Sequence, residues 1–441
     1  MKDKKAINIV LGLLKQFSEG RLVSLNREQR QSAQIVRYYN EIIRFWSKLN
    51  FVIKKTLRSL KLATEVNHQE NAIYLYATYR CMFEAAPIRS ILDELNISNE
   101  SIKIRDFLNK ILTFSWKTAL EGKSKQEKLS IEEAIPSFFI ESLVPVISFN
   151  FLKENIKHMN DIKKQSDFTV RFNDLSGETP KIDLIERIIT SLESKGVILV
   201  QDQEIAELYH VSSNNKSTLI KNDWYQKGNL IIQDKASAII VKALDPKPNE
   251  LICDMCAAPG MKTSLIAQYT GNRSKIIAGE YLPDRTYLLR DVLDRLNVQN
   301  KSLITTDSIE FPLRFEEHFD RVLLDAPCTG SGTFLANPEL KWRQSEKFLH
   351  QNVTLQKKLL GKAIKMLKPN GILVFSTCSL YQEEGEKQLL DLQDKLIPLD
   401  LQEWCSPSYE INGSKIPGTG RLFPSIHSTQ GFFIGKFKKK E

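Results

Sequence analysis

Hydrophobic residues in the first 160 positions recur at intervals of three and four residues. The spacing is clear in "AINIVLGLLKQF", "QSAQIVRYYNEIIRFWSKL", "ENAIYLYATYRCMF" and "IKIRDFLNKILTFSW". It places apolar side chains on one face of a helix. Gly and Pro are scarce in this region, and no fixed period indicates a repeat array. The sequence therefore predicts a helical bundle over residues 1–160.

A different pattern follows in residues 161–225. The segments "DFTVRFN" and "GVILVQD" are short and rich in β-branched and aromatic residues, which favours strands. Between them, "KIDLIERIITSLESK" has the helical spacing. We expect a small α+β subdomain here.

Apolar runs alternate with helical stretches over residues 226–441. The expected strands are "ELICDMC", "KIIAGEY", "KSLITTD", "DRVLLDA", "GILVFST" and "GFFIGKF". Such alternation is typical of the α/β class, with a doubly wound parallel sheet covered by helices on both faces. Ligands of such sheets bind beyond the carboxyl ends of the strands.

Charge and hydropathy restrict the class of protein further. The 441 residues carry a formal net charge of +9, and no apolar run reaches the roughly 18 residues that span a bilayer. The N-terminal stretch is basic and amphipathic and lacks a small-residue cleavage site, so we expect a first helix of a cytoplasmic protein without membrane association. The positive charge favours a nucleic-acid partner, although charge alone supports mere solubility equally well.

The six cysteines are too sparse for a disulfide scaffold. Cys253 and Cys256 form a CxxC pair, but no second CxxC or CxxH completes a tetrahedral metal site. Cys253 also lies inside an apolar, strand-like run. We therefore expect no bound metal.

Three expected strand ends carry groups that suit a nucleoside cofactor. Ala257, Ala258 and Gly260 form a small-residue turn that leads into a helix, whose free N–H groups face the turn. Glu280 ends the next strand, where a carboxylate suits a ribose diol, and Asp307 ends the third. Each acid alone could be a helix cap. The chain lacks GxxxxGK[ST] and GxGxxG, so S-adenosylmethionine fits better than ATP or NAD.

The fourth and fifth strand ends each carry a thiol, Cys328 in "DAPCTG" and Cys378 in "FSTCSL". One buried structural cysteine would need no explanation, but two at neighbouring strand ends favour chemistry. Methylation of cytosine at carbon 5 needs a thiolate that adds to carbon 6, a contact to ring N3 and a base. Asp325 could supply the N3 contact, and Lys262 could stabilise the site electrostatically.

Several motifs resemble those of the RNA 5-methylcytosine methyltransferases of the Sun/RsmB/NSUN group. They are "DMCAAPGMKT", "LLDAPCTGSGT", "FSTCSL" followed by "EEGE", and "RLFPSIHSTQGFF", with "GNLIIQDKASAIIVKALDPKPNE" as a similar lead-in. The resemblance covers residues 226–437. More weakly, "VRFN" resembles the start of the small RNA-binding subdomain of that family. Segments such as "AIYLYATYRCMFEAAP" are similar to its NusB-like helical domain.

This resemblance implies roles for matching residues. Cys378 would be the nucleophile, and Cys328 would assist proton removal or product release, with Asp325 and Lys262 beside them. The implied contacts of S-adenosylmethionine are Cys256, Ala257, Ala258, Pro259, Gly260, Met261, Lys262, Glu280, Arg285, Asp307 and Asp325. The sequence departs from the usual pattern at Met261, where a second Gly is common, at Glu280, where Asp is common, and at Gln430, where an acid is frequent.

The resemblance also implies three domains, which are a Rossmann-like class I methyltransferase domain over 226–441, an RNA-binding subdomain over 161–225 and a NusB-like domain over 1–160. We expect a monomer that methylates ribosomal RNA of the small subunit, with transfer RNA as the second choice. Two alternatives remain open. One is an RNA-binding assembly factor whose methyltransferase part is idle, and the other is a DNA enzyme in which Cys328 attacks.

Overall fold

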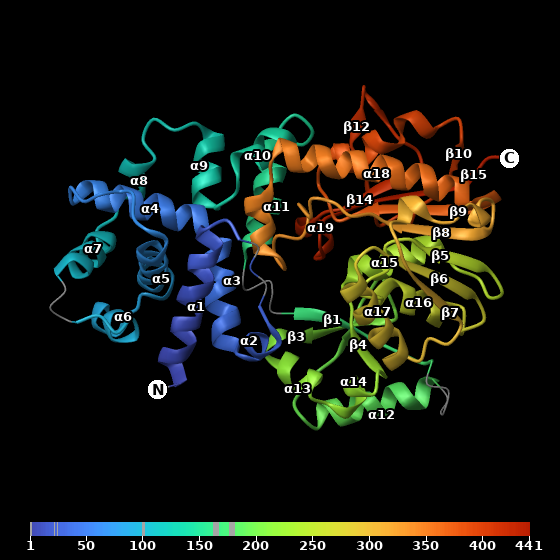
Figure 1. Cartoon of the computed structure of the whole chain (residues 1–441), viewed down its shortest axis with the longest axis horizontal. Helices are drawn as coiled ribbons and strands as arrows, with labels where there is room; N and C mark the ends of the chain where they lie inside the picture. Colours follow the sequence, from blue (N-terminus) through green and yellow to red (C-terminus); the bar gives the residue numbers. More distant parts are fainter. Residues whose placement is uncertain (1, 22, 24, 99–101, 162–166, 176–180) are drawn as a thin grey trace. The chain divides into compact units, whose positions relative to one another are not determined.

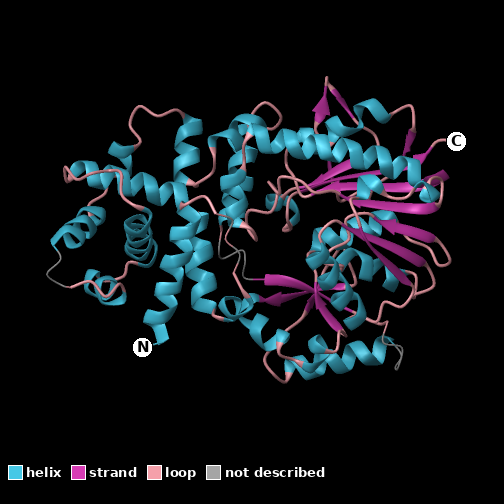
Figure 2. Ribbon diagram, in the orientation of Figure 1, coloured by secondary structure: helices cyan, strands magenta, loops and turns pink. Residues whose placement is uncertain are grey.

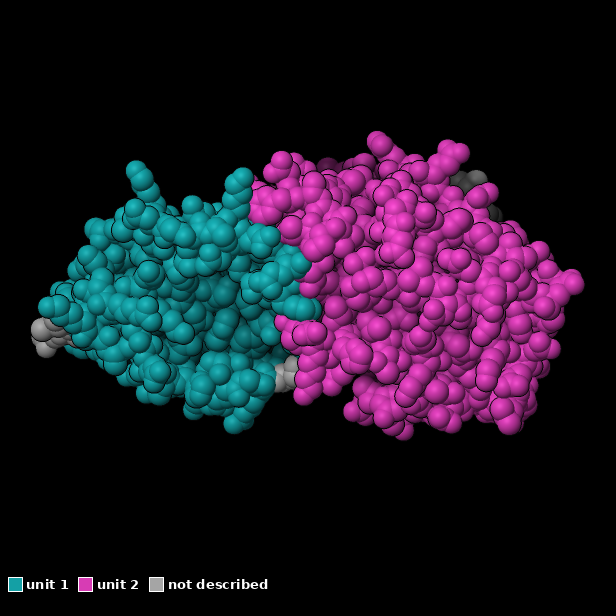
Figure 3. All heavy atoms as spheres, turned by 90° about the horizontal axis from the view of Figure 1, so that it is seen from above, with its two compact units in different colours: residues 1–141, 336–343 teal, residues 142–335, 344–441 magenta. Residues whose placement is uncertain are grey.

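The computed structural model describes residues 2–21, 23, 25–98, 102–161, 167–175 and 181–441 (Figure 1). The chain divides into two compact units, coloured separately in Figure 3. Unit 1 comprises residues 1–141 and 336–343, and unit 2 comprises residues 142–335 and 344–441. Among the described residues, no helix has the length and apolar character needed to cross a membrane.

Unit 1 is helical, as the spacing of its apolar residues predicts (Figure 2). Its helices are α1 (Lys2–Ser18), α2 (Arg27–Gln31), α3 (Ala33–Arg44), α4 (Trp46–Ser59), α5 (His68–Glu84), α6 (Ile88–Glu94), α7 (Ile102–Leu112), α8 (Trp116–Ala119) and α9 (Lys125–Glu132). The longer ones share one core, to which α1, α3, α4, α5 and α7 contribute Val10, Ile42, Val52, Leu75 and Phe107. Burial of these apolar faces holds the bundle together.

A short segment from far along the sequence completes unit 1. It contains the 3-10 helix η5 (Pro338–Arg343). The indole Nε1 of Trp342 donates a hydrogen bond to the carbonyl of Ile43 at 2.7 Å. The fully buried Lys341 donates to the carbonyls of Arg44 at 3.1 Å and Ala134 at 3.3 Å. Unit 1 is therefore assembled from two separate stretches of sequence, while the three expected domain ranges and their roles stay predictions.

Unit 2 contains a small α+β region. The chain passes from unit 1 to unit 2 within α10 (Ser137–Leu143) and continues through α11 (Phe149–Asn160). The elements of the small region are β1 (Asp167–Phe172), α12 (Lys181–Glu193), β2 (Val200–Gln201), β3 (Leu208–Ser212), α13 (Lys216–Ile220), α14 (Asp223–Gln226) and β4 (Leu230–Ile232). The strands form an antiparallel sheet in the order β2-β3-β1-β4. Both expected strands and the helix between them are present.

The main sheet of unit 2 has the order β11-β14-β15-β9-β8-β5-β6-β7, with β10 (Leu396–Pro398) beside β15. Its strands are β5 (Leu251–Asp254), β6 (Lys275–Glu280), β7 (Lys301–Thr305), β8 (Phe319–Asp325), β9 (Leu367–Thr377), β11 (Ser406–Pro407), β14 (Thr419–Leu422) and β15 (Phe432–Lys439). The five strands from β5 to β9 pair in parallel. All six expected strands exist, but β15 differs from the parallel arrangement because it pairs antiparallel with β9 and β14.

Helices cover both faces of this sheet (Figure 1). They are α15 (Lys235–Leu244), α16 (Met261–Tyr269) and α17 (Pro283–Arg295) on one face and α18 (Glu346–Met366) on the other, with the short α19 (Pro424–His427) near the end. Each face of the sheet packs against its helices in a separate hydrophobic core, and successive residues of a strand point alternately into these two cores. Ile252 packs with α15–α17, whereas Cys253 packs with α18. Cys253 is thus a core residue, and burial raises the pKa of its thiol well above its ordinary value.

One buried arginine joins the small sheet to the main domain. Arg171 on β1 donates from Nε to Gln233 Oε1 at 2.7 Å and from Nη2 to Ser264 Oγ on α16 at 2.8 Å, and it also contacts Gln268. Burial lowers the pKa of this guanidinium to about 10. The arginine of the "VRFN" stretch therefore points into the protein and braces helix α16.

A candidate active site at the ends of the parallel strands

The turn between β5 and α16 brings the backbone close to the strand ends. Gly260 has φ of +107°, and the N–H of Gly260 donates to the carbonyl of Ala257 at 2.8 Å. A Cβ at Gly260 would lie 2.9 Å from Leu289 Cδ1 of α17. Both the dihedral angle and the close packing therefore require glycine. Ala257 and Ala258 are buried, Pro259 is exposed, and Met261 begins the helix.

A cavity of about 310 Å³ opens beside this turn. It is lined by Met255, Cys256, Glu280, Tyr281, Leu282, Arg285, Asp307, Ser308, Pro327, Leu355 and Leu359. Four residues implied as cofactor contacts, Cys256, Glu280, Arg285 and Asp307, thus come together on one wall. The aliphatic walls from α18 were missed, since Leu355 and Leu359 belong to no motif and show only helical spacing.

Glu280 and Asp307 carry the acidic groups of the cavity. Glu280 is buried at the end of β6, accepts a hydrogen bond from the Leu282 N–H at 3.1 Å and pairs with Arg285 at 3.4 Å. Arg285 also donates to the carbonyl of Ala258 at 2.9 Å, so it ties the carboxylate to the turn. Asp307 lies two residues beyond β7 and caps the next turn by accepting from the Ile309 N–H at 3.0 Å. Asp307 is therefore both a cap and part of the cavity wall.

These residues fit an adenosine group. The aliphatic side chains of Leu282, Leu355 and Leu359 give the cavity apolar walls, and Glu280 offers a carboxylate at one end. Gly279, directly before Glu280, packs tightly against the core residue Phe311, since a Cβ there would lie 2.6 Å from Phe311 Cζ. No phosphate-binding loop is present in the sequence, which suits a nucleoside without a pyrophosphate.

Lys262 and Asp325 form an ion pair at the ends of α16 and β8. Lys262 Nζ lies 2.5 Å from Asp325 Oδ2, and Ser376 Oγ donates to Asp325 Oδ1 at 2.7 Å. Burial alone would lower the pKa of Lys262, but the adjacent Asp325 carboxylate outweighs it and raises that pKa above its ordinary value. Lys262 is therefore a cation held next to the carboxylate. Sequence reasoning missed the role of Ser376, whose contact depends on the pairing of β8 with β9.

The two thiols of the motifs meet beyond the same pair of strands. Asp325 on β8 is in register with Ser376 on β9, and Cys328 Sγ lies 3.1 Å from Cys378 Sγ. Both cysteines are half-buried. The contact with Cys378, together with burial, raises the pKa of Cys328 well above its ordinary value. Lys262 interacts electrostatically with the Cys378 sulfur. A cation, a carboxylate and two thiols thus occupy one edge of the sheet.

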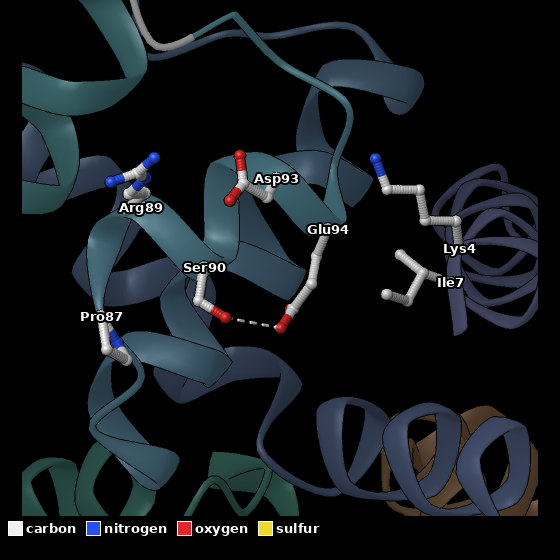
Figure 4. A pocket seen from close by; sticks show the side chains of 7 residues that line it. All are labelled: Lys4, Ile7, Pro87, Arg89, Ser90, Asp93 and Glu94. Atoms are coloured by element: carbon white, nitrogen blue, oxygen red, sulfur yellow. Dashed lines mark hydrogen bonds between the residues drawn. The ribbon is translucent and has the colours of Figure 1, made fainter. Parts of the chain in front are cut away.

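A second hollow, of about 500 Å³, lies in unit 1 (Figure 4). It is lined by Lys4, Ile7, Pro87, Arg89, Ser90, Asp93 and Glu94. Glu94 already accepts hydrogen bonds from Ser90, Tyr76 and Arg80. Its carboxylate therefore serves the packing of α5 and α6, and we assign no chemistry to this hollow.

Comparison with known proteins agrees with this geometry. A family model described as "16S rRNA methyltransferase RsmB/F" matches residues 241–438. A tRNA (cytosine(49)-C(5))-methyltransferase of Pyrococcus abyssi is 34% identical over 285 residues, which are 62% of this chain and 88% of the relative. A mouse 28S rRNA (cytosine-C(5))-methyltransferase is 32% identical over 72% of this chain, but the chain spans only 41% of that relative's length.

Solved structures agree as well. The crystal structure of the protein PH0851 superposes with a TM-score of 0.79 at 26% identity and covers 99% of both chains. A methyltransferase homologue from Pyrococcus horikoshii is 30% identical with a TM-score of 0.61, and the match covers 72% of this chain and 99% of that one. The chain covers 88% of the archaeal tRNA enzyme at 34% identity, and the match to the family model includes the strand-end motifs, so this chain belongs to the RNA (cytosine-C5)-methyltransferase family.

Proposed function

We propose that this chain transfers a methyl group from S-adenosylmethionine to carbon 5 of a cytosine in RNA, with the Cys378 thiolate as the attacking group. The observation that carries this proposal is the pair of thiols 3.1 Å apart, next to the Lys262–Asp325 ion pair. Carbon 5 of cytosine is a weak nucleophile. A covalent bond from a thiolate to carbon 6 makes it reactive, which is why the reaction needs a thiol at this place.

The position of each residue suggests its role in the proposed reaction. Cys378 Sγ forms the bond to carbon 6, and electron density moves to carbon 5 and ring N3. The proton that Cys378 gives up on ionising would be shared between Asp325 and N3, while Lys262, whose Nζ lies 2.5 Å from Asp325 Oδ2, stays a cation beside them. Bound S-adenosylmethionine supplies the electrophilic methyl group.

The thiol of Cys328 acts at the end of the reaction. After methylation, a base removes the carbon 5 proton, the bond between carbon 6 and sulfur breaks, and Cys378 regains its thiolate. A thiol with a raised pKa is a poor base at neutral pH but remains a hydrogen-bond donor. Cys328 is therefore placed to donate a hydrogen bond to the departing Cys378 sulfur, which favours product release over proton removal.

RNA that contains 5-azacytidine tests the nucleophile. This base has nitrogen at position 5, so no proton can be removed there and the covalent adduct persists. The adduct should form with the wild type and with Cys328→Ala but disappear with Cys378→Ala, as judged by a mobility shift on a denaturing gel. Cys405→Ala is the matched control, since Cys405 is another half-buried thiol of unit 2. An adduct that disappears with Cys328→Ala instead would show that Cys328 is the attacking thiol, as in the alternative of a DNA methyltransferase.

We further propose small-subunit ribosomal RNA as the substrate, supported by the description of the matching family model. Transfer RNA is the second candidate, supported by the archaeal tRNA enzyme of which the chain covers 88%. Bisulfite sequencing of total RNA from cells with and without the gene should reveal a cytosine whose protection depends on the gene. The RNA class that contains it distinguishes the two candidates. No such cytosine, despite bound cofactor, would favour an idle RNA-binding role.

A further inference from the structure

A buried carboxylate lies behind the two thiols. Glu384 belongs to the 3-10 helix η6 (Gln382–Glu384) that follows β9, and it is fully buried. Its Oε1 accepts hydrogen bonds from the Thr329 N–H at 2.9 Å and from Gln356 Nε2 at 3.0 Å. Its Oε2 accepts from the Thr329 hydroxyl at 2.5 Å. An N–H and an amide NH₂ can only donate, so the carboxyl group is surrounded by donors.

The hydroxyl groups of Ser331 and Ser379 belong to the same hydrogen-bond network. Ser331 Oγ accepts from the Leu380 N–H at 2.9 Å, and Ser379 Oγ accepts from the Tyr381 N–H at 3.1 Å. Their protons are therefore directed onward, and Ser379 also forms a side-chain hydrogen bond with Glu384. Burial raises the pKa of Glu384 above its ordinary value, and the hydrogen bonds from Ser379, Thr329 and Gln356 oppose that rise by stabilising the carboxylate.

Glu384 is connected to both cysteines through the residues that follow them. Thr329 comes directly after Cys328, and Ser379 directly after Cys378. The charge of Glu384 adds to the effects of Cys378 and of burial in raising the pKa of Cys328. On the other side, Lys262 is the cation that faces Cys378. Glu384 also faces Tyr381, whose pKa is raised chiefly by burial and further by the charge of Glu384. The two thiols thus lie between opposite charges.

We propose that Glu384 is a positioning residue that decides which of the two thiols ionises, because its negative charge keeps the proton on Cys328 and leaves Cys378 as the attacking thiolate. The inference deepens the proposed function and rests on it for the role of Cys378. It also explains why two thiols in contact have different tasks. The shared proton stays on Cys328, because the next residue, Thr329, is hydrogen-bonded to the anion through both its N–H and its hydroxyl. The negative charge stays on Cys378, which interacts with the Lys262 ammonium.

Alkylation of the two thiols tests this without RNA or cofactor. The protein is treated with iodoacetamide at several pH values, and the initial labelling of each cysteine is measured by peptide mass spectrometry. In the wild type, Cys378 should react about tenfold faster than Cys328 or more. In Glu384→Gln, labelling of Cys328 should rise about tenfold, and its pH profile should move to lower pH, as expected for about one pKa unit.

Two further variants serve as controls. Glu384→Asp keeps the charge and should keep the preference for Cys378, while Gln356→Leu removes one donor to Glu384 and should leave the order of reactivity unchanged. Far-UV circular dichroism and thermal melting verify that each variant is folded. If folded Glu384→Gln still protects Cys328 as the wild type does, the proposal is wrong.

A second measurement avoids substitution of Glu384. In Cys378→Ser, the remaining Cys328 has lost its thiol neighbour but still faces Glu384. It should react about tenfold more slowly than Cys378 does in Cys328→Ser, as expected for about one pKa unit. Equal rates would overturn the proposal. Because neither experiment involves RNA, a normal alkylation result with no 5-azacytidine adduct would contradict only the proposed function.

Discussion

Asp254 shows how a buried carboxylate can lower the stability of the fold. It ends β5, is buried, and accepts a hydrogen bond from the Thr263 hydroxyl at 2.7 Å through Oδ2. Within the described structure, its other oxygen has no hydrogen-bond partner. Burial raises the pKa of this carboxyl from 3.8 to about 6. At neutral pH the protein therefore holds a charge that the unfolded chain would carry more easily.

The effect on stability has a definite sign. Because the pKa is higher in the folded protein, protonated Asp254 is favoured at low pH, and this advantage is lost as the pH rises towards about 6. The stability of Asp254→Asn, compared with that of the wild type, should therefore increase by about 2 kcal/mol when the pH is raised from about 4 to about 7. Urea unfolding at both pH values measures this, with the exposed Asp291→Asn as the control. A difference that does not change with pH would contradict the assignment.

At the scale of elements, helix α16 is held at two points. Its first turn carries Lys262, which pairs with Asp325 on β8. Farther along the helix, Ser264 and Gln268 accept hydrogen bonds from Arg171 of β1. The helix therefore connects the small sheet with the edge of the main sheet that carries the Lys262–Asp325 ion pair. Loss of Arg171 would leave buried polar groups of Gln233 and Gln268 without a donor.

We expect Arg171→Met to destabilise the protein by about 3 kcal/mol. Arg171→Lys should restore little, because one ammonium cannot reach all three partners. Chemical denaturation measures the loss, and Arg187→Met is the matched control, since Arg187 is an exposed arginine of the same small region, on α12. Equal stabilities of the two methionine variants would show that the buried arginine does not brace α16.

The sequence predicted the five parallel strands and β15 of the main sheet but missed its shorter strands β10, β11 and β14, as well as β3 and β4 of the small sheet. Apolar runs predicted the six strands, and the motifs brought Cys328, Cys378, Asp325 and Lys262 into one hypothesis, which the alkylation and trapping experiments can test. Sequence alone could not show contacts that depend on tertiary pairing. Ser376 meets Asp325 only because β8 and β9 are in register, and Glu384 reaches Thr329 across 55 positions. An apolar run also does not reveal whether its strand pairs parallel or antiparallel, and β15 proved to be antiparallel to its neighbours.

At the scale of the whole molecule, the net charge of +9 leads us to expect that the proposed binding of RNA depends on salt. Contacts between lysine or arginine and phosphate release counterions, so affinity falls as salt rises. The dissociation constant for a labelled RNA should rise at least about tenfold between about 50 and 200 mM salt. Fluorescence anisotropy measures it, with a change of buffer at constant ionic strength as the control. A flat response would show that phosphate contacts contribute little.

The eight residues 336–343 have a consequence for synthesis. A ribosome makes the chain from the N-terminus, so helices α1–α9 emerge first, and the segment that donates hydrogen bonds to Ile43 and Arg44 emerges only after residues 142–335. Until then, the carbonyl groups of Ile43 and Arg44 lack these native donors. Unit 1 can therefore form its complete set of contacts only after most of unit 2 has been synthesised.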